Sequence, residues 1–243
     1  MQRENNNNQR LSKKIARSGF SSRREAEKYI ESGRVKVNGV IIKELSFQVG
    51  INDQIHIDGQ RINKEGKTRL WKFHKPKGLI TSHKDEKSRQ TIFQILPKNL
   101  PRLITVGRLD LNSEGLLLLT NDGDLKRKLE LPSSKIVRSY RVRAKGVANE
   151  NKLSRLRQGI TVDGIRYRPM EVNIIKQNTS NVWLSVRLME GKNREIRLSF
   201  QAIGLQVNKL IRTSFGPISL GKLDKGQIEE VELDGFSAIL KDD

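Results

Sequence analysis

A run of four consecutive leucines, residues 116–119, constrains the fold of this chain more than any other stretch. Gly115 precedes the run, and the turn-forming residues Asn121, Asp122 and Gly123 follow it. A short apolar run between turn signals is typical of a strand that is buried on both faces. We therefore expect this strand to lie inside the core of the larger part of the protein.

The remaining sequence beyond Leu70 also favours strands over helices. Residues 182–188 alternate apolar and polar side chains, which predicts one buried strand face. Helices are expected over residues 124–130, 150–158 and 194–202. These patterns predict an α+β domain built on a mixed, mainly antiparallel sheet.

The front of the chain has the pattern of a small α/β module. Two short helices are expected first, and Ser22 with Glu25 predicts a capping box at the start of the second. Alternating residues around Asn38-Gly39 then predict a hairpin, because Asn and Gly tolerate the positive φ angles of its turn. The expected organisation is a disordered tail over residues 1–8, the module over 9–59, a linker over 60–69 and the larger domain over 70–240.

The charge of the chain indicates its class of partner. Lys and Arg number 47 against 27 Asp and Glu, a formal net charge of +20, so a nucleic acid is the expected partner. The chain has no cysteine and only three histidines, so we expect no metal site. No stretch approaches the roughly 20 apolar residues that span a membrane, and the N-terminus lacks the apolar core of a secretory signal. We expect a cytoplasmic monomer that does not bind membranes.

Basic side chains are concentrated in the predicted module. They admit two interpretations, an ordinary solvated face or a phosphate-binding surface, and the scarcity of interleaved acidic residues favours the second. The pattern resembles the alpha-L RNA-binding module of ribosomal proteins and RNA-modifying enzymes. The residues expected to bind RNA are Arg10, Lys13, Lys14, Arg17, Arg23, Arg24, Lys28 and Lys36.

The segment Gly107-Arg108-Leu109-Asp110 precedes the leucine strand. A polar segment between two apolar ones is expected at the rim of the core, where Asp110 could be either an ion-paired loop residue or a reactive carboxylate. With Gly115-Leu116-Leu117-Leu118 and Thr120-Asn121-Asp122-Gly123, the segment resembles the catalytic motif of the pseudouridine synthases that modify ribosomal RNA, the RsuA family. The whole chain most resembles the RluB branch of that family.

This resemblance implies a reaction and a set of residues. Asp110 is expected to attack or deprotonate the ribose of a uridine, after which uracil rotates and rejoins the sugar through C5 without a cofactor. Because the target atoms are hidden in folded RNA, the uridine must first be extruded. The resemblance assigns Tyr140 to stacking on the extruded uracil, although a tyrosine on a strand is ordinarily a core residue.

Further expected site residues follow from the same resemblance and from the spacing of residues 193–201. Arg197 is expected to pair with the Asp110 carboxylate, and Leu210 to pack under the base. Asn193 is expected to cap the helix that carries Arg197, and Arg194, Arg197 and Gln201 are expected on one face of that helix. Lys75, Arg108 and Arg194 complete the expected substrate contacts, with Arg108 filling the gap left by the flipped base.

Two other functions compete with this hypothesis. The chain could be a non-catalytic RNA-binding or ribosome-assembly protein, in which the sheet domain is a scaffold. A nucleotide-dependent RNA enzyme is disfavoured, because no phosphate loop of the form GxxxxGK[ST] is present. The resemblance to the RluB branch favours a uridine in 23S ribosomal RNA as the target, although relatives that act on small-subunit RNA share the same motifs.

Overall fold

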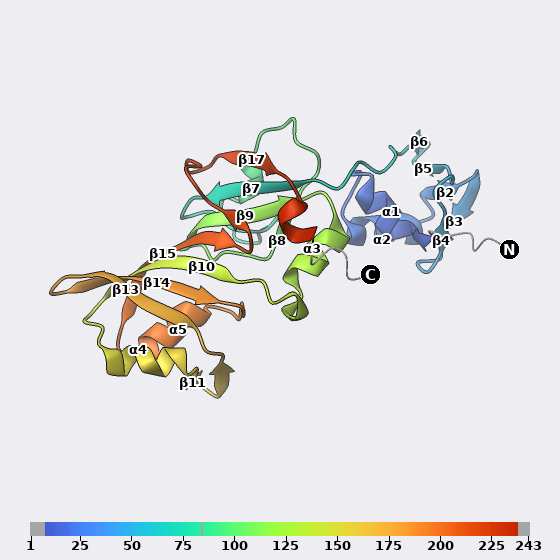
Figure 1. The fold of residues 1–243 in the computed structure, drawn as a ribbon. Coiled ribbons are helices and arrows are strands. Elements are labelled where there is room, and N and C mark those ends of the chain that lie inside the picture. Colours follow the sequence, from blue (N-terminus) through green and yellow to red (C-terminus); the bar gives the residue numbers. More distant parts are fainter. Residues whose placement is uncertain (1–7, 84, 238–243) are drawn as a thin grey trace. The chain divides into compact units, whose positions relative to one another are not determined.

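The computed structural model describes residues 8–83 and 85–237. The chain forms two compact units (Figure 1). Unit 1 comprises residues 1–68 with the short segments 101–103 and 121–123, and unit 2 comprises the rest. Apart from Asn8, the tail predicted over residues 1–8 lies outside the described residues.

Unit 1 has the two helices and the hairpin that the sequence predicts. Ser22 accepts a hydrogen bond from the Glu25 amide, and the Glu25 side chain accepts one from the Ser22 amide, which completes the expected capping box. Asn38 and Gly39 have φ angles of 49° and 88° and form the hairpin turn. The elements are β1 (Gln9–Arg10), α1 (Leu11–Arg17), α2 (Arg23–Glu31), β2 (Val35–Val37), β3 (Val40–Ile42), β4 (Gln48–Val49), β5 (Ile55–Ile57) and β6 (Gln60–Arg61).

A single small core holds unit 1 together. Leu11 and Ile15 of α1, Ala26 and Ile30 of α2, and Val35 of β2 are fully buried in it. The two helices thus bury their apolar faces against each other and the strands, and their charged faces are left to solvent.

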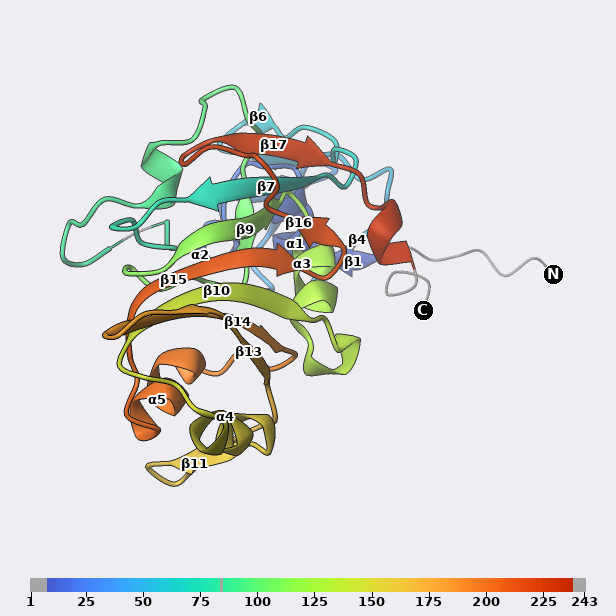
Figure 2. The same ribbon diagram turned by 60° about the vertical axis from the view of Figure 1, so that its left-hand side comes forward.

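Unit 2 is built on a nine-stranded sheet with the order β13 (Glu171–Gln177), β14 (Asn181–Leu188), β10 (Arg138–Lys145), β15 (Gln206–Phe215), β9 (Glu114–Thr120), β7 (Leu70–Lys75) and β17 (Ile228–Val231). In addition, β8 (Ile104–Val106) pairs with β9, and β16 (Ile218–Ser219) pairs with β15. Figure 2 shows these strands lying one beside the next in that order. All neighbours are antiparallel except β9 and β15. The mixed, mainly antiparallel sheet predicted from the sequence is confirmed.

The strands of unit 2 alternate with short helices. The remaining elements are η1 (Ile92–Gln94), α3 (Gly123–Glu130), η2 (Pro132–Ser134), α4 (Glu150–Arg157), β11 (Ile160–Val162), β12 (Ile165–Tyr167), α5 (Glu195–Ala202) and η3 (Asp234–Phe236).

The leucine run lies in an interior strand of this sheet, between β15 and β7. Residues 116–119 of β9 are all 0% exposed, as expected for a strand covered on both faces. Gly115, at the start of β9, has a φ of +107°, and a Cβ there would lie 2.3 Å from the carbonyl oxygen of Arg212. Only glycine permits β9 and β15 to approach this closely.

Unit 2 has two hydrophobic cores. One core packs α4 and α5 against the buried faces of β10, β14 and β15, with Val142, Leu184 and Phe200 fully buried. The other packs α3 against Leu116, Leu118 and their neighbours. Among the described residues, no helix is long and apolar enough to cross a membrane.

Candidate active site

Asp110 lies in a tightly held turn, residues 107–113, between β8 and β9. The Gly107 amide donates to Glu130 Oε1 at 2.6 Å, and Thr81 Oγ1 donates to the Leu109 carbonyl at 2.8 Å. The Ser113 amide donates to the Asp110 carbonyl at 3.0 Å and closes the turn. The segment predicted at the rim of the core is therefore a rigid loop.

The side chain of Lys75 supports this turn from inside the core. Lys75 is fully buried, and its Nζ donates to the carbonyls of Ser113 at 3.0 Å, Pro76 at 3.1 Å and Asp110 at 3.2 Å. Burial lowers the pKa of Lys75 to about 8, although the nearby Asp110 and Glu114 charges act in the opposite direction. Lys75 was expected to contact substrate, whereas this geometry makes it a support of the Asp110 turn.

Arg197 of α5 holds the same turn from another side. Its Nη2 donates to the Asn112 carbonyl at 2.9 Å and to Ser113 Oγ at 3.4 Å, and its Nη1 donates to the Val207 carbonyl at 3.1 Å. Burial and the like charge of Arg194 lower the pKa of Arg197, while Asp110 raises it. The attraction between Arg197 and Asp110 is present, but the expected ion pair is not formed within the described residues.

The Asp110 carboxylate itself is left open. It is partly exposed, and within residues 8–83 and 85–237 no hydrogen bond or ion pair reaches its side-chain oxygens. The neighbouring Arg108 is exposed to solvent. Lys75 and Arg197 therefore place two cationic groups beside a carboxylate whose oxygens remain available.

The register of the sheet aligns further residues with this turn. Tyr140 on β10 is paired with Arg212 on β15, Arg212 with Gly115 on β9, and Gly115 with Lys75 on β7. Neighbouring strands lie about 4.8 Å apart, so Tyr140 is about 10 Å from the start of β9 across the sheet. Tyr140, the expected stacking residue, is thus aligned across this row of paired residues with Lys75, which supports the Asp110 turn.

Tyr140 and Leu210 share one face of this row. Tyr140 is partly buried and packs on the same core as Val142 and Ala144, as predicted from the strand periodicity. Leu210 is 7% exposed and pairs with Val142 across β10 and β15. One aromatic and one aliphatic side chain thus lie at the surface of the core next to the row.

Arg212 belongs to this arrangement and was not predicted. It is 3% exposed, its Nε donates to the Leu116 carbonyl at 2.6 Å, and its Nη2 is buried without a hydrogen bond in the described structure. A signal for it existed, because Arg212 is two residues beyond the buried Leu210 and so falls on the same strand face. A charge at a buried alternating position is a candidate functional or positioning residue.

Helix α5 begins differently from the prediction. Arg194, with a φ of 51°, occupies the capping position without a side-chain cap bond, so the assignment of the cap to Asn193 is wrong. Glu195, which follows, is 4% exposed, and burial together with the Glu190 charge raises its pKa to about 7. Its Oε2 accepts a hydrogen bond from the Lys192 amide at 3.1 Å, so the carboxyl of the first helical turn closes this end of α5 instead.

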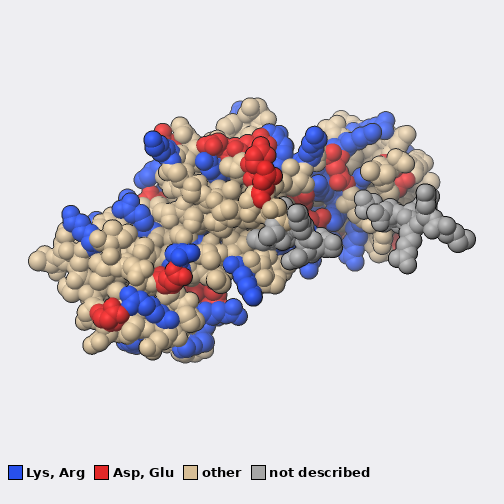
Figure 3. All heavy atoms as spheres, in the orientation of Figure 1, with Lys and Arg blue, Asp and Glu red and all other residues tan. Residues whose placement is uncertain are grey.

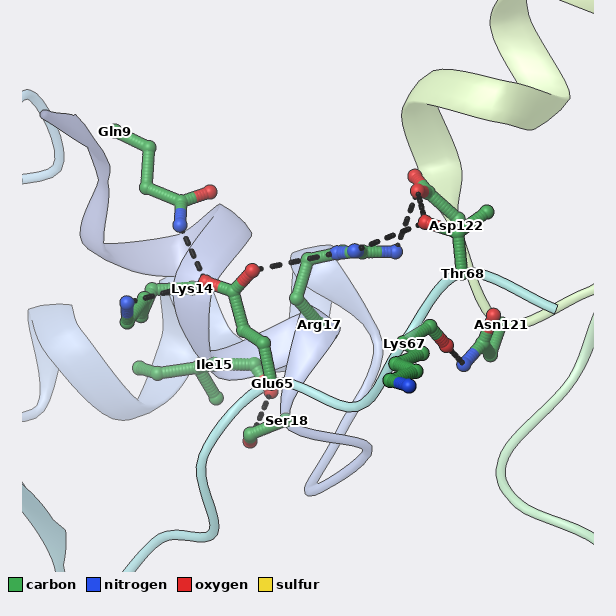
Figure 4. A network of polar contacts seen from close by, with 10 residues as sticks. All are labelled: Gln9, Lys14, Ile15, Arg17, Ser18, Glu65, Lys67, Thr68, Asn121 and Asp122. Carbon is green, nitrogen blue, oxygen red and sulfur yellow. Dashed lines mark hydrogen bonds and ion pairs between the residues drawn. The ribbon is translucent and has the colours of Figure 1, made fainter. Parts of the chain in front are cut away.

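Unit 1 carries the basic residues expected to bind RNA, and most of them are exposed. Several members of the set have partners within the unit. Lys14 lies 3.2 Å from Glu65, Arg17 lies 3.5 Å from Glu65 and 2.7 Å from Asp122 (Figure 4), and Arg23 lies 3.4 Å from Glu27. The side chains of Lys14 and Arg17 are only 13% and 15% exposed. The exposed members of the predicted set are Arg10, Arg23, Arg24, Lys28 and Lys36.

Basic side chains are distributed over the surfaces of both units on the face shown in Figure 3. Acidic side chains on that face gather over β17, which carries Glu229 and Glu230. Within the part of the chain that the structure describes, no group of three or more metal-ligating side chains occurs.

Comparison with known proteins identifies the family of the chain. Residues 69–202 match the family of RNA pseudouridylate synthases, and residues 9–55 match the S4 domain. The chain belongs to the RNA pseudouridylate synthase family, and it is therefore an isomerase that acts on RNA. The alpha-L RNA-binding module expected at the front of the chain is its S4 domain.

Individual relatives agree along nearly the whole length. An uncharacterized RNA pseudouridine synthase of Rickettsia typhi is 50% identical over 225 residues, covering 91% of each chain. Ribosomal large subunit pseudouridine synthase B of Bacillus subtilis is 36% identical over 228 residues, covering 92% of each. A solved pseudouridylate synthase structure superposes with a TM-score of 0.67 at 27% identity, covering 96% of this chain and 98% of that one. The predicted family and enzyme class are confirmed.

Proposed function

We propose that this enzyme isomerises one uridine to pseudouridine in ribosomal RNA of the large subunit, with Asp110 as its catalytic carboxylate. The relative from Bacillus subtilis named for the large ribosomal subunit supports this substrate. The observation that carries the catalytic role is the open carboxylate of Asp110 in a turn fixed by Lys75 and Arg197. A reaction at a ribose requires a reactive group that is already held in position.

The reaction balances without a co-reactant, because uridine and pseudouridine are isomers. Asp110 either attacks C1′ or removes a proton from the ribose, and the bond from C1′ to N1 breaks. Uracil rotates and C5 forms the new bond to C1′, while the bond from Asp110 to C1′ breaks or, on the other route, the ribose regains its proton. C5 then loses its proton and N1 gains one. The chain's own residues thus need to supply binding, orientation and proton transfer only.

The surrounding residues take roles that fit their places. Tyr140 stacks on the extruded uracil and assists removal of the C5 proton, and Leu210 packs beneath the base. Arg108, exposed beside the turn, fills the space that the flipped base leaves in the RNA. Arg197 acts through the turn that it holds, and Lys75 acts as a positioning residue.

The S4 domain anchors the RNA through phosphate contacts, which offset the cost of extruding the nucleotide. We assign residues 9–59 to this anchor and 70–240 to the catalytic domain. The predicted linker, residues 60–69, begins with strand β6, which pairs with β5 of the anchor. The enzyme acts as a monomer, and a ribosomal substrate would place it in the cytoplasm.

The test is the pseudouridine content of 23S ribosomal RNA treated with the purified enzyme, read by mass spectrometry after chemical labelling of pseudouridine. Asp110→Asn should yield no product. Asp163→Asn is the matched control, because Asp163 is exposed in the turn between β11 and β12 and the same isosteric change there should leave activity intact. Equal product from the wild type and Asp110→Asn would refute the assignment. Mapping pseudouridines in cells that lack the enzyme would identify the target uridine.

A further inference from the structure

A basic hollow of about 610 Å³ lies beside the Asp110 turn in unit 2. Its polar side chains come from the end of β10, from Arg194 and the helix α5 that follows it, and from the start of β15, and its wall includes the backbone of Gly146 and Gly204. The polar side chains that line it are Lys145, Arg194, Arg197, Gln201 and Gln206. We call this feature the basic hollow.

The basic hollow is rich in unneutralised charge. Three cations line it and no carboxylate does. Lys145 and Arg194 are exposed, and neither side chain has a hydrogen bond or ion pair with any residue that the structure describes. The like charge of Arg194 contributes to lowering the pKa of Arg197, so the guanidinium groups repel each other across the hollow. An anion between them would relieve that repulsion.

The wall of the hollow is closely packed. Gly146 has a φ of +114°, and a Cβ there would lie 3.0 Å from Leu205 Cδ2 and 3.2 Å from the Gly204 carbonyl. The end of β10 and the turn after α5 are therefore in close contact. Lys152 adds a further cation near Gly204, where its Nζ is held by the Val147 carbonyl at 3.1 Å.

Arg197 connects the hollow to the catalytic turn. Its Nη1 bonds the Val207 carbonyl in the lining, and its Nη2 bonds the Asn112 carbonyl, two residues after Asp110. A group bound in the hollow is thus separated from the Asp110 turn by one side chain. The volume lies within the range of about 300–1,000 Å³ of sites that hold small organic ligands, so it admits more than a single ion.

We propose that the basic hollow is a binding subsite for the RNA backbone, and that it takes the phosphodiester and ribose of a nucleotide adjacent to the flipped uridine. Lys145 and Arg194 pair with the phosphate. Gln201 and Gln206, which both donate and accept, bond the ribose hydroxyls, including the 2′-OH that distinguishes RNA from DNA. This subsite rests on the proposed function, because it assumes that the flipped uridine is bound beside Asp110.

The test measures binding of a 23S ribosomal RNA transcript over a series of salt concentrations by fluorescence anisotropy. Lys145→Gln should weaken binding roughly tenfold and reduce the slope of log K against log salt by about 1, as expected for the loss of one phosphate contact. Gln201→Glu places a carboxylate in the hollow and should weaken binding further.

Two controls carry the same charge changes outside the hollow. Lys98→Gln and Gln90→Glu alter exposed residues of unit 2 that do not line it. Unchanged affinity and slope in Lys145→Gln, or equal losses in the control pair, would overturn the proposal. Inorganic phosphate and uridine monophosphate form a second arm of the test. If either compound binds in the hollow as tightly as the transcript does, the hollow is a site for a free anion and not for RNA.

The binding readout separates this proposal from the proposed function. If the wild type makes no pseudouridine but the hollow variants still lose RNA affinity, the catalytic assignment fails and the subsite survives. If product forms normally and the hollow variants bind as the wild type does, the subsite fails alone.

Discussion

Replacing Lys75 by methionine removes a buried ammonium group and keeps a side chain of similar length. The Nζ of Lys75 donates to the carbonyls of Asp110 and Ser113 in the turn and to the carbonyl of the adjacent Pro76. Burial lowers the pKa of Lys75 from 10.5 to about 8. The folded state therefore binds the proton less tightly than the unfolded state does. Stability contributed by this group should rise as the pH increases from about 8 to 10.5.

The size of the effect follows from the two pKa values. At pH 7 the buried charge costs about 3 kcal/mol relative to a neutral amine, and at pH 9.5 the remaining cost is about half of that. The wild type should thus gain about 2 kcal/mol relative to Lys75→Met between these pH values. Subtracting the variant cancels the titration of all the groups that the two proteins share.

Urea unfolding at pH 7 and pH 9.5 measures this difference directly. Lys72→Met is the control, because Lys72 lies on the same strand but is paired at the surface with Glu229 at 3.2 Å. That variant should follow the wild type. Lys75→Met should also lower kcat, on the order of 10²-fold, because the Asp110 turn loses its internal support. Parallel pH dependence in the wild type and Lys75→Met would refute the argument from burial.

Three further outcomes are expected. Tyr140→Phe keeps the ring and should lower kcat by about 10²-fold or more while RNA affinity stays within about twofold, and equal losses of both would make Tyr140 structural. Gly115→Ala should destabilise the protein by more than about 3 kcal/mol in urea unfolding, because its Cβ would lie 2.3 Å from a carbonyl oxygen, whereas Gly123→Ala meets nothing within 4 Å and should change stability by less than about 1 kcal/mol. The stability of Glu195→Gln should increase relative to that of the wild type as the pH rises from 4.5 through 7. The raised pKa of the buried Glu195 carboxyl makes its ionisation unfavourable in that range, so the wild type loses stability there. Equal stability of the two proteins at pH 8 would contradict this.

Local patterns in the sequence predict the local elements of this fold well. The capping box at Ser22, the Asn38-Gly39 turn and the buried leucines of β9 each depend on residues close together in the chain. The helix over residues 194–202 was predicted from its apolar face, and only its cap was misassigned. The prediction of the cap residue was wrong because Arg194 adopts a positive φ. Few non-glycine residues do so, and residue spacing does not reveal it.

The arrangement of the site depends on contacts that no local pattern encodes. The parallel pairing of β9 with β15 joins residues almost 100 positions apart and brings Arg212 beside Gly115. The burial of Lys75 follows from the turn that folds over it, so the sequence predicted a substrate contact where the structure has a support. The family resemblance supplied Asp110 and Tyr140, but the way in which the turn is held emerges only from the fold.

The manner in which the turn is held also determines what a substitution at Asp110 reports. Lys75 and Arg197 bond main-chain carbonyls of the turn, and in the described structure neither bonds the Asp110 carboxylate. Changing that carboxylate to an amide therefore breaks none of the bonds that fix the loop. If the hydrogen bonds that hold the turn do not depend on the Asp110 side chain, Asp110→Asn should unfold at the same urea concentration as the wild type but form no pseudouridine. Loss of activity in Asp110→Asn would then report the loss of the catalytic carboxylate and not a loss of folding. Loss of activity in Lys75→Met would report the contribution of the hydrogen bonds that hold the turn.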